Sequence, residues 1–161
     1  MDDASDSSDD RPILVGIKPG IPPAVISVAE EQASGFGCDV VFAYVELNSA
    51  LIELDPEGVR TSESLDPDVD DEMASIVREL RQTLADAFHD SPVRWSLRTL
   101  GGDPASALSR LAVEVDARVI VVGSRHPGII HRVEELFSKS VAASLITGQT
   151  RPVLVVPAGR R

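Results

Sequence analysis

The residues best suited to chemistry in this sequence lie in the stretch that follows the apolar run ending near residue 123. This stretch opens with Gly123-Ser124-Arg125 and closes with Ser140-Val141. Small residues after a buried strand let backbone N–H groups approach phosphate, and a helix that begins behind them favours negative charge. Lys18, which follows an earlier apolar run, adds a cation that suits phosphate as a point charge. The stretch therefore opens like a phosphate-binding loop.

More cations lie between the two ends of the stretch. They are His126, His131, Arg132 and Lys139. They could converge with Lys18 on one anion, either a nucleotide in an unusual pose or another ligand. The other interpretation, which we favour, is that they are solvated loop residues with no common ligand.

Catalytic and metal-binding patterns are missing from the sequence. It contains no Walker A lysine motif and no zinc-ligand spacing. Cys38 is the only cysteine, so an internal disulfide is impossible and a thiolate cluster is not expected. His126 near Ser124 and Ser138 is the nearest approach to a base with a nucleophile, and nothing orients it. We expect a protein without enzymatic activity and without a bound metal.

Length and composition indicate one globular domain. The chain has 161 residues, of which 43% are hydrophobic, which is enough to bury a core. No apolar run approaches the ~20 residues that span a bilayer. The start, MDDASDSSDD, lacks the basic and apolar regions of a signal peptide, so a cytoplasmic location is expected.

The acidic charge is concentrated in two segments. Residues 1–10 contain five Asp and no base, and residues 48–71 contain eight acids against Arg60 alone. The net charge of the whole chain is −11, so the remaining residues are close to neutral. Like charges at this density keep a segment solvated. We expect a disordered tail at 1–10, a flexible loop at 48–71 and a single domain over 11–158 that binds neither nucleic acid nor membrane.

Five short apolar runs predict strands. They are ILVGI (13–17), DVVFAYV (39–45), VRWSLRT (93–99), RVIVVG (118–123) and PVLVVP (152–157). The first, fourth and fifth are almost continuously apolar, as in strands buried on both faces. The third alternates between apolar and polar residues, which is typical of an edge strand.

Helical patterns separate the runs. A stripe from Met73 to Phe88 spans four turns, Asp103-Pro104 predicts a capped helix start, and Pro22-Pro23 opens a helix that ends near Gly35 or Gly37. A last helix covers at least residues 140–146. Alternating strands and helices predict a Rossmann-like α/β fold with helices on both faces of a five-stranded parallel sheet of order 3-2-1-4-5. Ligands of such sheets bind where the winding reverses, here between Lys18 and Gly123.

Three blocks of the sequence, in this order, resemble the universal stress protein family. They are ILVGIKPG, GGDPASALSRLAVEVDARVIVVGSR and SVAASLITGQTRPVLVVP, and the similarity covers residues 12–157. The resemblance implies a Rossmann-like domain that dimerises through its last strand, residues 152–157. Some members of the family bind ATP and others do not. The ATP binders resemble the pattern G-x2-G-x9-G-[S/T], with an Asp after the first strand. The resemblance implies that the candidate nucleotide site of this chain consists of Gly123, Ser124, Arg125, Ser140, Val141 and Lys18.

The nucleotide signature of that family is broken in this chain. Gly123 matches the first glycine, but His126 and Lys139 stand at the other two, and three extra residues separate Gly123 from Ser140. Lys18 replaces the Asp. No Gly or Pro interrupts residues 129–147, so one helix could run through Ser140; the alternative is a turn followed by a helix capped by Ser140. We expect a non-enzymatic regulatory or interaction protein without a cofactor, in which ATP binding is weak or absent. The alternative is an ATP or AMP sensor with a variant phosphate loop.

Overall fold

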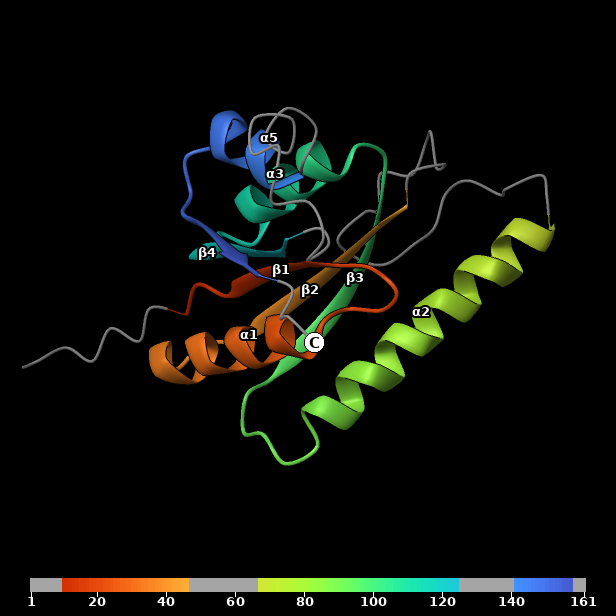
Figure 1. Cartoon of the computed structure of the whole chain (residues 1–161), viewed down its shortest axis with the longest axis horizontal. Helices are drawn as coiled ribbons and strands as arrows, with labels where there is room; N and C mark the ends of the chain where they lie inside the picture. The colour runs from red at the N-terminus through yellow and green to blue at the C-terminus, as the bar shows by residue number, and fades with distance from the viewer. Residues whose placement is uncertain (1–9, 47–66, 125–140, 158–161) are drawn as a thin grey trace, which may run out of the picture.

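The computed structural model describes residues 10–46, 67–124 and 141–157, apart from the side chains of residues 67–70. Its strands form one parallel sheet of order β3-β2-β1-β4-β5 (Figure 1). The strands are β1 (Ile13–Ile17), β2 (Val40–Glu46), β3 (Trp95–Gly101), β4 (Val119–Gly123) and β5 (Val153–Val156). The predicted sheet and strand order are confirmed.

Helices cover both faces of the sheet. They are α1 (Pro23–Phe36), α2 (Pro67–Ala87), α3 (Pro104–Glu114) and α5 (Val141–Gly148). In Figure 1, α1 and α2 lie below the sheet, and α3 and α5 lie above it. Helix α1 begins after Pro22 and ends at Gly37, whose φ of 67° is the left-handed conformation that glycine adopts without strain. Both ends of this helix agree with the prediction.

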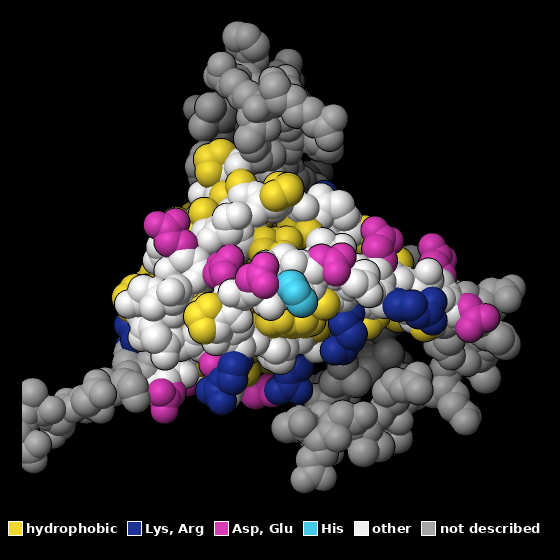
Figure 2. Space-filling model, turned by 90° about the horizontal axis from the view of Figure 1, so that it is seen from below, with side chains coloured by type: hydrophobic (Ala, Val, Ile, Leu, Met, Phe, Trp, Pro, Cys, Tyr) yellow, Lys and Arg dark blue, Asp and Glu magenta, His cyan; other side chains and the backbone are white. Residues whose placement is uncertain are grey.

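Two apolar cores result from the alternation of side chains along the strands. Ile13 and Val15 of β1 point to the layer of α1 and α2, whereas Leu14 points to the layer of α3 and α5. The lower core contains an aromatic cluster, in which the Phe42 ring lies 5.7 Å from Phe88 and 6.4 Å from Trp95, centroid to centroid. Figure 2, which views the molecule from below, shows that charged side chains border the hydrophobic ones on this side.

The sequence predicted the exposure of one edge strand correctly and that of the other wrongly. β3 lies at one edge, as its alternating pattern indicated, although it begins at Trp95 rather than Val93. The expectation that the last strand is buried on both faces is wrong. β5 is the other edge of the sheet, only its Val156 is buried, and Val155 is 38% exposed. The reason is that β5 pairs with β4 alone in the described sheet.

The acidic segments fall largely outside the described residues. Helix α2 begins at Pro67, so residues 67–71 of the expected flexible loop are helical. Proline is favoured in the first turn of a helix, where its missing N–H costs nothing. Residues 48–66 and residues 1–9 lie outside the part of the chain that the structure describes.

Candidate functional site

The candidate site lies at the carboxyl edge of the sheet, where β1 and β4 are neighbours. From β1 the chain winds to β2 and β3 on one side, and later to β4 and β5 on the other. Gly16 of β1 is paired with Val122 of β4, so both strands end level with each other. Lys18 follows the end of β1, and Ser124 follows the end of β4. The ends of β1 and β4 therefore meet where the winding reverses, as the topology predicted. The sequence placed Lys18 opposite Gly123, whereas continuing the pairing of Gly16 with Val122 brings Gly123 level with Ile17, one residue before Lys18.

Lys18 is exposed at this edge. It begins the turn Lys18-Pro19-Gly20, in which Gly20 has a φ of 72°, and this turn leads to the proline-rich start of α1. A lysine ammonium has three donors and no acceptor. At this position the side chain can neutralise an anion, but it cannot accept a hydrogen bond from a sugar hydroxyl or a base.

Gly123 is glycine for a steric reason. It is not among the glycines with positive φ, which in the described residues are Gly20, Gly37 and Gly102. A Cβ added at Gly123 would instead lie 3.2 Å from Cγ2 of Val25 in α1, which is tighter than an ordinary contact. A side chain at this position would press on α1, so Gly123 has a packing role where β4 approaches α1.

The other predicted site residues are only partly within the described chain. Ser124 donates its backbone N–H to the carbonyl of Val156 at 2.8 Å, so this amide belongs to the sheet edge. Val141 is half-buried at the start of α5 and packs on the upper core. Arg125 and Ser140 lie outside the described residues, as do the four further cations between them. Whether one helix runs through Ser140 is therefore untested.

Two residues at the carboxyl edge have structural roles that the structure makes explicit. The carboxylate of Asp103 accepts the backbone N–H of Ser106 at 2.9 Å and caps α3, as predicted. This hydrogen bond lowers the pKa of Asp103. Gly102, with a φ of 99°, turns the chain from β3 into this cap and donates to the carbonyl of Glu46 at 3.0 Å.

The carboxyl end of β2 is an acidic environment. Burial raises the pKa of Tyr44, and the carboxylates of Glu46 and Glu72 raise it further. Glu46 ends β2 and Glu72 lies in α2. The carboxylates of Glu46 and Glu72 would repel a phosphate at the end of β2. The ammonium of Lys18, at the end of β1, would attract it.

Sequence reasoning missed the importance of Gly16. A Cβ at this position would lie 2.9 Å from Cδ1 of Leu108, a buried residue of α3. The signal was available, because a glycine inside an apolar strand often marks a close approach of another element. Gly16 therefore lets the end of the Leu108 side chain of α3 pack directly on β1.

Within the described ranges, no group of three or more His, Cys, Asp and Glu side chains could hold a metal ion. None of the described helices combines the length and the hydropathy of a membrane span. An open hollow of about 440 Å³ lies between α3 and the turn from α5 to β5, lined partly by Arg110, Val113 and Arg151. It lies toward the amino ends of the strands, away from the candidate site.

Comparison with known proteins relates the whole domain to one family. The sequence model of the universal stress protein family matches residues 11–157. A search of curated proteins finds no match. The solved structures that share the fold include the three described next.

The first is the universal stress protein from Archaeoglobus fulgidus in complex with dAMP, which is 19% identical with a TM-score of 0.60 over 90% of this chain and 96% of that one. The second is a universal stress protein in complex with cAMP, which is 20% identical with a TM-score of 0.61 over 92% and 98%. The third is a protein of the universal stress protein family from Burkholderia pseudomallei, 25% identical with a TM-score of 0.61 over 94% and 98%.

The family model spans nearly all of the described domain, and the strand order is that of the fold shared with the solved universal stress proteins. This chain belongs to the universal stress protein family.

Proposed function

We propose that this protein is a non-enzymatic regulatory or interaction protein whose nucleotide site is degenerate, so that ATP binds weakly or not at all. The observation that carries the proposal is Lys18. It is exposed at the end of β1, where ATP-binding members of the family carry the Asp that accepts hydrogen bonds from the nucleoside. A group that only donates cannot replace that acceptor.

The expected loss of affinity is large. A buried nucleoside hydroxyl that has lost its hydrogen-bond acceptor weakens the binding free energy by ~1–3 kcal/mol. Each side chain at a left-handed glycine position, as the sequence pattern expects for His126 and Lys139, costs roughly 1–2 kcal/mol. Since ~1.4 kcal/mol is a factor of ten, the three changes together remove roughly two to five decades of affinity. A site with a Kd of about 1 μM would therefore become one with a Kd of roughly 0.1 mM at best and about 0.1 M at worst.

The alternative is an ATP or AMP sensor with a variant phosphate loop. The relatives solved with dAMP and with cAMP favour it, because they share this fold. The chain also keeps Gly123 and Ser124 beside Lys18 at the point where the winding reverses. In that case the ammonium of Lys18 would contact phosphate rather than the nucleoside.

Thermal unfolding with ATP and AMP separates the two functions. A ligand at a hundred times its Kd stabilises by ~2.7 kcal/mol, which for a chain of this size raises Tm by roughly 5–11 °C. A ligand near its Kd adds only ~0.4 kcal/mol, or about 1–2 °C. We expect the smaller shift, or none, for the wild type at about 0.1 mM nucleotide, a concentration that is a hundred times the Kd of a micromolar site. A rise of several degrees would refute the degenerate-site proposal.

Lys18→Asp tests the role of this residue directly. If the missing acceptor limits binding, the variant shows a larger nucleotide-dependent Tm shift than the wild type. If Lys18 holds phosphate, the variant loses the shift that the wild type shows, which is the sensor outcome. Arg78→Asp on α2 changes the charge equally at another exposed place and serves as the control. Gly123→Val is unsuitable, because its side chain would collide with Val25.

We also propose a homodimer through residues 152–157. The exposed side of β5 and the 38% exposure of Val155 support this interface. Light scattering at high micromolar concentration is expected to give about twice the 17.2 kDa of one chain. Val155→Lys is expected to reduce the mass to that of a monomer, whereas Val113→Lys, at a position 65% exposed on α3, leaves it unchanged. A wild-type mass near 17 kDa would exclude the dimer.

A further inference from the structure

Arginines precede four of the five parallel strands. Arg94 and Arg118 stand directly before β3 and β4, and Arg11 and Arg151 stand two residues before β1 and β5. Because all the strands are parallel, these four residues lie along the amino edge of the sheet, opposite the candidate nucleotide site. We call this edge, defined by the four residues, the arginine edge.

Backbone hydrogen bonds keep the strand starts level at the arginine edge. The N–H of Arg118 donates to the carbonyl of Pro12, and the N–H of Ile13 donates to that of Asp39, both at 2.9 Å. The N–H of Val40 donates to the carbonyl of Arg94, also at 2.9 Å. The sheet ladder therefore continues to the residues that carry the charges and fixes their spacing.

The four arginines differ in how far they are committed to other groups. Arg151 is mostly buried and donates to the carboxylate of Asp116 at 2.9 Å and to the carbonyl of Ala117 at 2.8 Å. Arg94 contacts the carboxylate of Asp39 at 3.1 Å, yet its side chain is 84% exposed. An exposed pair of this kind is weak, so Arg94 can take a second carboxylate.

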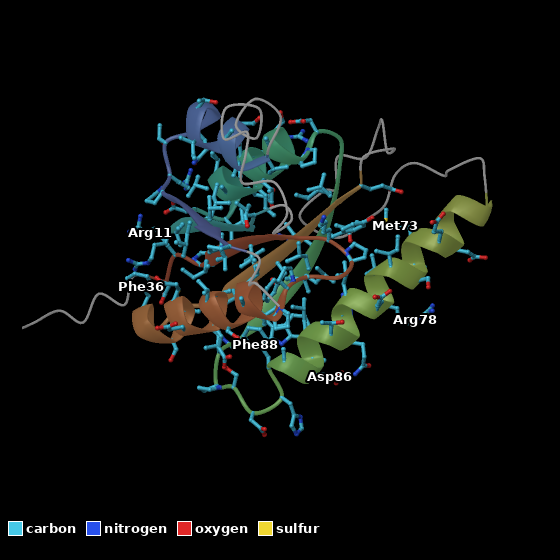
Figure 3. The ribbon with its side chains drawn as sticks, in the orientation of Figure 1. Arg11, Phe36, Met73, Arg78, Asp86 and Phe88 are labelled. Carbon is cyan, nitrogen blue, oxygen red and sulfur yellow. The ribbon has the colours of Figure 1, made fainter. Side chains whose placement is uncertain are left out.

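An exposed aromatic ring adjoins the same edge. The guanidinium carbon of Arg118 lies 4.2 Å from the centroid of Phe36, which is 46% exposed at the end of α1. Figure 3 shows Arg11 and Phe36 at the same end of the molecule, where β1 begins. A guanidinium stacked on an exposed ring offers both a cation and apolar surface.

The chain carries an acidic segment that joins the fold at this place. Residues 1–10 contain five Asp and no base, and Arg11 follows them directly. We propose that the arginine edge binds the chain's own N-terminal segment, residues 1–9, through aspartates that contact Arg94 and Arg118.

Reach and connectivity favour this occupant. Nine residues extend roughly 30 Å, whereas five strands are about 19 Å across from first to last. Attachment at Arg11 also gives the segment a high effective concentration at the edge. The other acidic segment follows Glu46, at the carboxyl end of β2, and therefore leaves the sheet at the opposite edge.

A nitroxide at the N-terminal segment tests the contact in the full-length chain. The label is placed on Ser5→Cys in a Cys38→Ala background, and the broadening of backbone amide signals is measured by NMR at low salt. Two further chains carry the same label. One has Arg94→Gln with Arg118→Gln; the matched control has Arg78→Gln with Arg81→Gln on α2. Arg118 is half-buried, and its replacement could unfold the protein. A chain with Arg94→Gln as its only arginine change is therefore measured as well.

We expect broadening at Phe36 and its neighbours that falls about two-fold or more in the Arg94 and Arg118 variants, and also at high salt. The control should match the wild type. Equal broadening in every variant would mean that the tether alone brings the label close, and would overturn the proposal. Broadening in a mixture of spin-labelled and isotope-labelled molecules would also overturn it, because the segment would then bind a second copy.

Discussion

Replacement of Asp103 by alanine tests how the carboxyl edge is built. The Asp103 carboxylate accepts the N–H of Ser106 at 2.9 Å at the start of α3. This helix buries Leu108 and Leu111 against the sheet. Because the first N–H groups of a helix have no partner within it, a lost cap destabilises the helix and the packing that depends on it.

The expected magnitude follows from the cap geometry. An N-cap Asp replaced by Ala costs ~1 kcal/mol, with a range of roughly 0.5–2, whereas Asn is a nearly equal cap. For a chain of this length, ~1 kcal/mol lowers Tm by about 2–4 °C. Asp103→Ala should therefore show that loss at pH 7, and Asp103→Asn should show little.

The pH dependence has a definite sign. The hydrogen bond from Ser106 lowers the pKa of Asp103 in the folded protein from its ordinary value of 3.8. The stabilisation is therefore present above that value and is lost as the pH falls through the lower folded pKa. The difference between wild type and Asp103→Ala should be constant above about pH 5 and shrink below about pH 4. Because Asp103 is exposed, solvent screens part of the effect.

Urea unfolding and thermal melts at pH 7 and pH 3 measure this difference. Asp90→Ala is the control, because its side chain is 98% exposed and caps no described helix. If Asp103→Ala melts like the wild type at pH 7, or if Asp103→Asn is as unstable as Asp103→Ala, the capping argument is wrong.

Three further predictions concern the packing and the acidic end of β2. Gly16→Ala places a Cβ 2.9 Å from Cδ1 of Leu108 and should lower the free energy of unfolding by ~1–3 kcal/mol, measured with urea. In the double variant with Leu108→Ala, the loss should be smaller than the sum of the two single losses, because the clash is removed. Additive losses would contradict the steric account. Phe42→Ala removes the ring at the centre of the aromatic cluster and should cost ~3–5 kcal/mol, so a loss below about 1 kcal/mol would contradict it. Absorbance at alkaline pH follows the ionisation of Tyr44, the single tyrosine, and should give a pKa above 10.0. Glu72→Gln should lower this pKa, and an unchanged pKa in the variant would contradict the role of the Glu72 charge. Below pH 10 the neutral tyrosine keeps its full contribution to stability, which is lost as the pH rises through the folded pKa.

Patterns that are local in the chain predicted most of the fold. The alternation of apolar runs with helical stripes depends on neighbouring residues, and it indicated the sheet order and the caps at Asp103 and Gly37. Parallel strands with helical connections leave few topologies, so the meeting of Lys18 with the end of β4 followed from the same patterns.

Contacts between residues distant in the sequence were decided by the tertiary structure. Gly123 and Gly16 look alike as strand glycines, yet the side chains that require them, Val25 and Leu108, become visible only when helices are placed against strands. The exposure of β5 depends on its having one neighbour, which no pattern within the apolar run reveals. The sequence alone determined which residue types stand at each position, including the lysine that follows β1. Which of those residues face one another depends on packing across the chain, because contact is a property of space rather than of sequence distance.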